Sequence, residues 1–178
     1  MRTAALIDKE LDHVLAALTP SNALVAQVSL HTGLRVSDVL ALRTDQLAPR
    51  FYITEQKTGK RKLVGLPGPL LDAIKAQAGT VWAFPGRDPE NHRSRQAVWK
   101  DVKRAATAFR VPANIGAHSF RKTYAQDVMD ACGDVERVRR ALNHSSDTVT
   151  MLYLIAARNV LKGNGSRRRP ARYGRRLR

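Results

Sequence analysis

The sequence is poor in cysteine and in acidic residues, and it contains no long apolar run. Its single cysteine, Cys132, excludes an internal disulfide. No stretch approaches the roughly 18 apolar residues that a membrane-spanning helix needs, and the charged N-terminal segment is unlike a secretory signal. We therefore expect a protein of the reducing cytoplasm, associated with no membrane, in which Cys132 serves packing rather than chemistry.

The shortage of acidic residues leaves a large positive charge. Only 15 Asp and Glu stand against 31 Lys and Arg, which gives a net charge of +16 and a pI near 11.0. Residues 163–178 hold seven arginines and no acid, yet the preceding residues still carry a net charge of +9. This surplus predicts a polyanionic partner, a nucleic acid. Charge alone favours a ribosomal or nucleoid-type binder over an enzyme.

The organisation of the chain is that of one domain with a tail. Its 178 residues suit a single core, and no internal repeat is visible. We expect a domain over residues 1–162 and a basic, flexible tail over residues 163–178, since KGNGSRRRPARYGRRLR breaks every apolar pattern. The fold class that the patterns predict is α+β, mainly α, with one small antiparallel β-hairpin.

Apolar periodicity predicts the individual elements. Two helices open the chain, the second starting at a Thr19 N-cap with Pro20 in its first turn and ending at Gly33. A short helix follows, then a hairpin from FYIT and LVGL with its turn around Thr58 and Gly59. The later segments are expected to be a helix (68–78), a short extended stretch (81–84) and four further helices (95–109, 118–131, 134–143 and 148–161).

His118 and Arg121 lie three residues apart and share one face at the start of a predicted helix. Backbone NH groups and the positive end of the helix dipole make such a start a natural phosphate site. Phe120 and Tyr124 are expected to turn toward the core. Taken alone, the pair more often marks an ordinary solvated helix start.

Arg35 follows the glycine turn in HTGLR. The planar guanidinium of arginine can bind two phosphate oxygens at once, and with Arg121 it could clamp one phosphodiester. The simpler alternative is a structural salt bridge, for which Asp38, three residues later, is the expected partner.

Tyr153 lies nine residues after His144, in a strongly apolar segment, and alone it would be interpreted as a core aromatic. Tyr52, Tyr124 and Tyr173 lack this spacing. The interpretation of Tyr153 changes because Arg35, the hairpin lysine Lys57 and the His118/Arg121 pair precede it in this order.

These motifs together resemble the tyrosine recombinase, or phage integrase, family. The matches are TGLR ending at Arg35, the hairpin lysine Lys57, HSFR at 118–121, LNH ending at His144, and TMLYL around Tyr153. The resemblance covers residues from about 6 to 160, which is the family's catalytic domain. Each motif is weak, and the ordered set is specific.

The resemblance implies a metal-free transesterification. Tyr153 would attack the scissile phosphate of double-stranded DNA, leaving a 3′-phosphotyrosine and a 5′-hydroxyl. Arg35 and Arg121 would hold the non-bridging oxygens, and Lys57 would protonate the leaving oxygen. His118 would assist proton transfer, and His144 would hydrogen-bond the phosphate.

The surroundings of the tyrosine make chemical sense of this assignment. A free tyrosine has a pKa near 10 and needs cations and a base to act as a nucleophile near neutral pH. Metal-dependent nucleases instead need converging carboxylates, and the sequence places no acidic cluster near these motifs. We expect no metal and no cofactor, and we expect most of the acidic residues to serve as helix caps and surface partners.

The sequence departs from the family in several places. Asn143 replaces the usual glycine before the second histidine, and asparagine tolerates the left-handed backbone conformation. Lys122 stands where many relatives have histidine and is expected to contact phosphate, as are Arg167, Arg168 and Arg169 of the tail. Because the sequence begins at the catalytic domain and not with the N-terminal core-binding domain usual in the family, we expect either a minimal enzyme or a fragment.

Three functions remain open from the sequence. The first is a site-specific recombinase or integrase that self-associates on DNA as a dimer or tetramer and is found with the nucleoid. The second is a type IB topoisomerase-like enzyme, which shares the nucleophile and the arginines. The third is a non-catalytic DNA-binding or regulatory protein that retains the fold.

Overall fold

The computed structural model of the chain describes residues 8–111 and 115–143. The helices and strands follow the predicted order. They are α1 (Asp8–Ala17), α2 (Pro20–Thr32), α3 (Val36–Leu40), the 3₁₀ turn η1 (Thr44–Gln46), β1 (Arg50–Thr54), β2 (Arg61–Gly65), α4 (Gly68–Gln77), α5 (Arg95–Ala108), α6 (Ala117–Cys132) and α7 (Val135–Ala141). The predicted fold class is confirmed. The predicted helix around Tyr153 lies outside the described residues.

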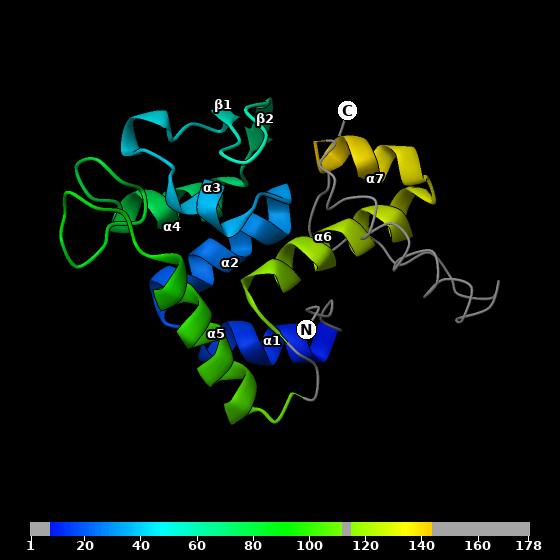
Figure 1. Cartoon of the computed structure of the whole chain (residues 1–178), viewed down its shortest axis with the longest axis horizontal. Coiled ribbons are helices and arrows are strands. Elements are labelled where there is room, and N and C mark those ends of the chain that lie inside the picture. The colour runs from blue at the N-terminus through cyan, green and yellow to red at the C-terminus, as the bar shows by residue number, and fades with distance from the viewer. Residues whose placement is uncertain (1–7, 112–114, 144–178) are drawn as a thin grey trace.

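Helix α2 is the centre of the molecule and packs against α3, α4 and α6 (Figure 1). Its Val25, Ala26, Val28 and Leu30 are fully buried, as expected for a helix enclosed by others. Helix α5 is amphipathic by contrast and buries Val98, Val102 and Ala105 while its other side faces solvent. The described helices include none long and apolar enough to cross a membrane.

The start of α2 differs from the prediction. Thr19 is its N-cap residue, but the Thr19 side chain makes no capping hydrogen bond. The hydroxyl instead donates to the Asp101 carboxylate of α5 at 2.9 Å, and Asp101 also accepts from the Thr19 backbone NH and from Asn22 Nδ2. A carboxylate 82 positions away in sequence therefore replaces the local cap.

The hairpin pairs β1 and β2 as antiparallel strands, with Ile53 opposite Lys62 and Tyr52 opposite Leu63. Phe51 and Ile53 are buried, whereas Tyr52 and Leu63 are exposed on the outer face. Directly opposed residues of an antiparallel pair lie on the same face, so the register places Lys62 on the inner face. The extended stretch predicted at residues 81–84 pairs only through one isolated bridge between Trp82 and Arg43.

Two apolar clusters divide the core. The larger one contains residues of all the helices from α1 through α5 and of the hairpin, together with Ile115 and Phe120. The smaller one joins the rest of α6 to α7 and consists of Tyr124, Ala125, Val128, Val138, Ala141 and Leu142. Because Phe120 and Tyr124 belong to different clusters, Arg121 between them lies at the boundary of the two.

Candidate active site

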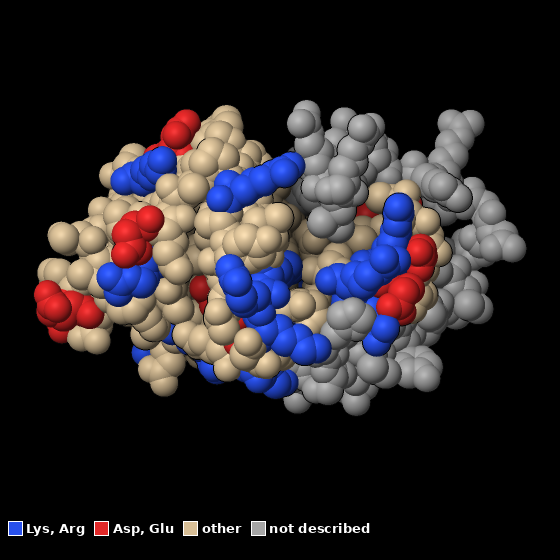
Figure 2. All heavy atoms as spheres, turned by 90° about the horizontal axis from the view of Figure 1, so that it is seen from above, with Lys and Arg blue, Asp and Glu red and all other residues tan. Residues whose placement is uncertain are grey.

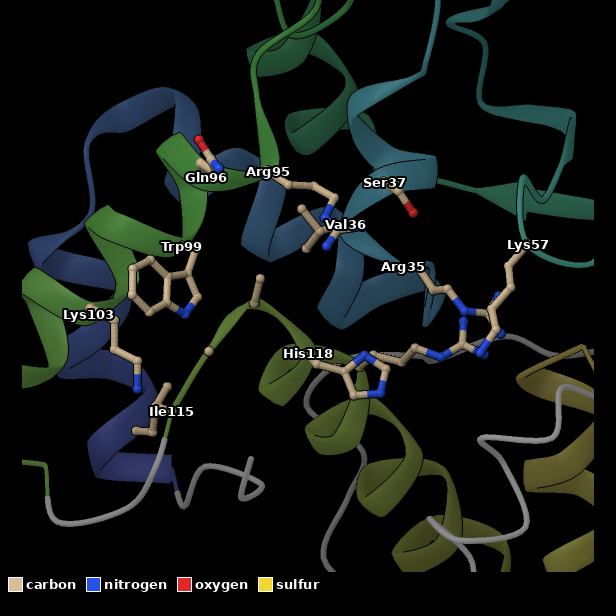
Figure 3. A pocket seen from close by; sticks show the side chains of 13 residues that line it. Arg35, Val36, Ser37, Lys57, Arg95, Gln96, Trp99, Lys103, Ile115 and His118 are labelled. Atoms are coloured by element: carbon tan, nitrogen blue, oxygen red, sulfur yellow. The ribbon is translucent and has the colours of Figure 1, made fainter. Parts of the chain in front are cut away.

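One cleft brings together four of the six predicted catalytic residues. It has a volume of about 680 Å³, and Arg35, Lys57, His118 and Arg121 line it (Figure 3). These residues come from the start of α3, the hairpin turn and the first turns of α6. The sequence predicted the members of this set individually, and the fold brings them to one place. His144 and Tyr153 lie outside the described residues.

Arg35 reaches the cleft because α2 ends at Gly33. Gly33 has the left-handed φ of 67°, as the predicted helix stop requires, and Arg35 is the N-cap of α3. A Cβ on Gly33 would lie 2.5 Å from the ring of Tyr124. Glycine is therefore needed here both for the turn and for the close approach of α6.

The partner of Arg35 is Glu55, not the predicted Asp38. Arg35 Nη1 donates to Glu55 Oε2 at 2.9 Å, and Arg35 is only 8% exposed while Glu55 is fully buried. Glu55 is therefore an exception to the expectation that most acidic residues serve as caps and surface partners. Helical spacing pointed to Asp38 as the partner, but Glu55 comes from the hairpin 20 positions away.

Glu55 and Asp38 anchor the turn that carries Lys57. The Glu55 carbonyl accepts from Gly59 N at 2.8 Å, and its carboxylate accepts from the Thr58 hydroxyl at 3.0 Å. Asp38 Oδ1 accepts from the Gln56 backbone NH at 2.9 Å. Burial raises the pKa of Asp38, the Gln56 NH opposes this shift, and the charge of Glu55 adds to it. Exposed Lys57 thus projects from a turn fixed on both sides.

Arg121 is a buried cation and not part of a solvated helix start. It is 1% exposed, and its guanidinium donates to the carbonyl of Gly33 and, at 3.0 Å, to the carbonyl of Leu142. His118 lies one turn earlier, half-buried at the cleft wall. The buried position of Arg121 excludes the simpler interpretation that the sequence left open.

The structure describes two of the rival tyrosines, and Tyr124 is packed in the core as the sequence predicted. Tyr124 is 3% exposed, and burial raises its pKa to about 12 although the charge of Arg121 opposes the shift. Tyr52 is exposed on the outer face of the hairpin, with the guanidinium of Arg61 4.5 Å from its ring centroid. Neither residue lines the cleft. Tyr173 lies outside the described residues.

The opposite wall of the cleft comes from α5, a helix whose exposed face the sequence reasoning missed. Arg95, Gln96, Trp99 and Lys103 line it, and Trp99 is half exposed despite its large ring (Figure 3). The signal was present in the sequence. Residues 95, 99 and 103 recur at intervals of four, and this row flanks the apolar face that contains Val98 and Val102.

The remaining predicted phosphate contacts are not established by the structure. Lys122 is half-buried on α6 and is not among the residues that line the cleft, so its contact with a phosphate stays a prediction. Arg167, Arg168 and Arg169 lie outside the described residues. Asn143 does adopt the left-handed conformation, with φ of 57°, that was expected of it.

The described residues that line the cleft suit an anion, since they include Arg35, Lys57, Arg95, Lys103 and Arg121 and no acidic residue. Basic side chains spread across the middle of the face seen in Figure 2, and acidic ones lie mainly toward its ends. Within the described ranges, no group of three or more His, Cys, Asp and Glu side chains is arranged to share a metal ion. The cleft presents the guanidinium groups of Arg35 and Arg121, the ammonium group of Lys57 and the imidazole of His118.

The chain belongs to the phage integrase family, whose family model matches residues 5–159. Among curated proteins, the tyrosine recombinase XerD of Mycobacterium tuberculosis is 28% identical over 158 residues. That match covers 82% of this chain and 51% of XerD. The chain thus spans about half the length of this relative.

Solved structures share the fold. The catalytic domain of bacteriophage HP1 integrase superposes with a TM-score of 0.62 at 21% identity and covers 92% of this chain and 96% of that domain. A lambda integrase dimer bound to a COC′ core site gives a TM-score of 0.70 at 19% identity over 84% of this chain and 60% of that chain. At these identities the likeness concerns the fold alone.

Proposed function

We propose that this chain is the catalytic part of a site-specific DNA recombinase or integrase that cuts and rejoins DNA through a 3′-phosphotyrosine on Tyr153. The observation that carries the proposal is the convergence of two nearly buried arginines, Arg35 and Arg121, on one cleft with Lys57 and His118. Membership of the family supports the assignment of Tyr153 as the nucleophile.

The reaction is a pair of transesterifications. The Tyr153 oxygen attacks the scissile phosphorus, and the bond from phosphorus to the 5′-oxygen breaks. Lys57 gives a proton to that leaving oxygen, while His118 assists removal of the tyrosine proton. A 5′-hydroxyl then attacks the phosphotyrosine in the reverse sense, so the phosphodiester is restored and no nucleotide cofactor is consumed.

The two arginines stabilise the charge that grows on the non-bridging oxygens. Fixed donors in a site with little water act more strongly than the same groups in bulk solvent, and they need little reorganisation during the reaction. Arg121 is held in place by the carbonyls of Gly33 and Leu142. His144 follows Asn143 and completes the phosphate ligands in this proposal.

The DNA duplex extends from the cleft across α5. Arg95 and Lys103 supply positive charge on that wall, and Trp99 supplies an exposed apolar ring beside them. Backbone contacts of this kind fix the register of a protein on DNA. The lambda integrase relative was solved as a dimer on its core site, which supports duplex DNA as the partner and self-association on it as a dimer or tetramer.

The chain divides, in this proposal, into a catalytic domain at residues 1–162 and a basic tail at residues 163–178. Lys122 and the tail arginines Arg167, Arg168 and Arg169 add contacts to phosphates. Affinity that depends on such contacts falls steeply as the salt concentration rises.

A covalent trapping experiment tests the proposal. Nicked suicide duplexes that tile the DNA around the protein's own gene are incubated with the wild type and with Tyr153→Phe, and adducts are detected on denaturing gels. We expect an adduct with the wild type and none with Tyr153→Phe. Tyr52→Phe is the matched control, because Tyr52 is exposed but lies outside the cleft, and it should retain the adduct.

The outcomes separate the alternative functions. An adduct that persists in Tyr153→Phe contradicts the nucleophile. Relaxation of supercoiled DNA without sequence preference indicates the topoisomerase-like activity. DNA binding on gels without an adduct on any duplex indicates a non-catalytic DNA-binding protein.

A further inference from the structure

A half-buried lysine behind the cleft joins two helix ends. Lys62, on the inner face of β2, donates from Nζ to the carbonyls of Thr32 and Ala141, each at 2.7 Å. Thr32 is the last residue of α2 and Ala141 is the last residue of α7. The final carbonyls of a helix lack intrahelical partners and carry the negative end of its dipole, so an ammonium is well matched to both.

Arg121 makes a second bridge between the same two segments. Its guanidinium donates to Gly33 and Leu142, the residues that directly follow Thr32 and Ala141. Two cations from different elements therefore connect residues 32–33 to residues 141–142. The position of Arg121 at the phosphate site and the position of the end of α7 depend on the same bridges.

Lys62 does not line the cleft. It lines a different groove, together with His31, Tyr124, Arg140 and Asn143. A phosphate held in the cleft would therefore contact Arg35 and Arg121 but not Lys62. Lys62 would act on the phosphate through these two arginines.

Charged groups of both signs lie near Lys62 and shift its pKa in opposite directions. Burial lowers its pKa to about 8, and the charges of Arg121 and Arg35 add to that shift, while the carboxylates of Glu55 and Asp38 oppose it. The Tyr124 ring centroid lies 5.9 Å from the ammonium, and the Tyr124 hydroxyl is neutral because its own pKa is raised to about 12. A phosphate bound by the arginines offsets their repulsion and raises the proton affinity of Lys62.

We propose that Lys62 is a positioning residue of the phosphate site, which fixes the end of α7 against the end of α2 and couples its own protonation to the binding of a phosphodiester. This inference rests on the proposed function, since it takes the anion in the cleft to be a DNA phosphate. It predicts that DNA binding near pH 8.5 takes up a proton at Lys62.

Calorimetry in two buffers of different ionisation enthalpy measures that proton. At pH 8.5 the wild type is titrated with a 20-base-pair duplex, and we expect an uptake of roughly half a proton per protein, given the pKa of about 8 before binding. Lys62→Arg keeps a charge and two donors but does not titrate in this range, so it should bind DNA within about threefold of the wild type without the uptake. Lys75→Met, which removes an exposed lysine of α4, is the control and should retain the uptake.

The adduct assay adds a second readout. Lys62→Met should slow adduct formation by about tenfold or more, because misplacement of a reacting group by about 1 Å can cost on the order of a hundredfold in rate. Lys62→Arg should restore most of the rate. Equal proton uptake by the wild type and Lys62→Arg would overturn the inference even if Tyr153 forms an adduct. Proton uptake that is lost in Lys62→Arg supports it even where no duplex is cleaved. Failure of the wild type to bind duplex DNA would sink both the inference and the proposed function.

Discussion

The region from α1 to α5 and the region formed by α6 and α7 are held together in different ways. The first encloses a large apolar cluster in which Val14, Leu30 and Phe84 are fully buried. In the second, the described residues form a cluster of only six. That smaller region packs on α2 through α6, and hydrogen bonds from Arg121 to the Gly33 carbonyl and from Lys62 to the Ala141 carbonyl also join it to the first.

The difference shows where stability and function overlap. Burial of apolar area stabilises the first region. The charged residues of the cleft are not part of that apolar cluster. The second region is attached partly by apolar packing of α6 on α2 and partly by cations that belong to the site or lie directly behind it. Mutations of these cations are therefore expected to change the position of α7 as well as the chemistry.

Substitution of Gly33 by alanine should have the largest effect, because it acts where the two regions meet. The new Cβ would meet the Tyr124 ring at 2.5 Å and would require a left-handed alanine. We expect the free energy of unfolding in urea to fall by about 3–5 kcal/mol. Gly133→Ala is the matched control, since Gly133 has φ of 66° but open space around it. Its loss should be about 1 kcal/mol, and equal losses would refute the role of the Tyr124 contact.

Truncation of one leucine in each region should separate global from local unfolding. Leu30→Ala leaves a cavity in the larger cluster and should lower the free energy of unfolding by about 3 kcal/mol. Leu142→Ala should instead speed hydrogen exchange of the α7 amides while those of α2 keep their protection. Exchange that rises equally in both helices would show that the two regions unfold as one unit.

Asp101→Asn tests a polar contact inside the larger region. Burial alone would raise the pKa of Asp101, but hydrogen bonds from Asn22, Thr19 and Arg104 lower it to about 2. The stabilisation is therefore present above about pH 4 and is lost as the pH falls toward 2. We expect the variant to lose about 1–3 kcal/mol of unfolding free energy at about pH 7, with the difference from the wild type shrinking below about pH 4. Asp45→Asn, at an exposed ion pair, should change it by less than about 0.5 kcal/mol.

The pH dependence of stability tests Lys62 apart from any DNA. Its pKa is lowered from 10.5 to about 8, so between these values the unfolded chain binds a proton that the folded chain has released. The unfolding free energy of the wild type should thus rise with pH across this window relative to Lys62→Met, by at most about 1.4 kcal/mol per pH unit. Denaturation at pH 7.5, 9 and 10.5 measures the difference. A constant difference would mean that Lys62 titrates normally.

Local patterns in the sequence were sufficient for most elements. Glycine ended α2 and α6 at Gly33 and Gly133, and the left-handed Asn143 was expected from its side chain. Apolar periodicity located the helices, because each buries one face or is enclosed entirely. The candidate residues Arg35, Lys57, His118 and Arg121 were identified by their order along the chain, and the fold placed them in one cleft.

Contacts between distant segments could not be predicted in this way. The Thr19 hydroxyl bonds Asp101, and Arg35 pairs with Glu55, because packing brings together residues whose separations have no helical period. The side chain of Lys62 gave no signal either, since an isolated lysine in a strand is usually solvated. Its burial follows from the hairpin register and from where α7 ends.

The pairing of Arg35 with Glu55 has a consequence for ion selectivity. An incoming anion must compete with a carboxylate already 2.9 Å from the guanidinium, so chloride gains little by entering the cleft. A duplex presents several phosphates at once to cations spread over α3, α5 and α6 and can offset that competition. We therefore expect a single small anion to bind the cleft more weakly than a duplex does.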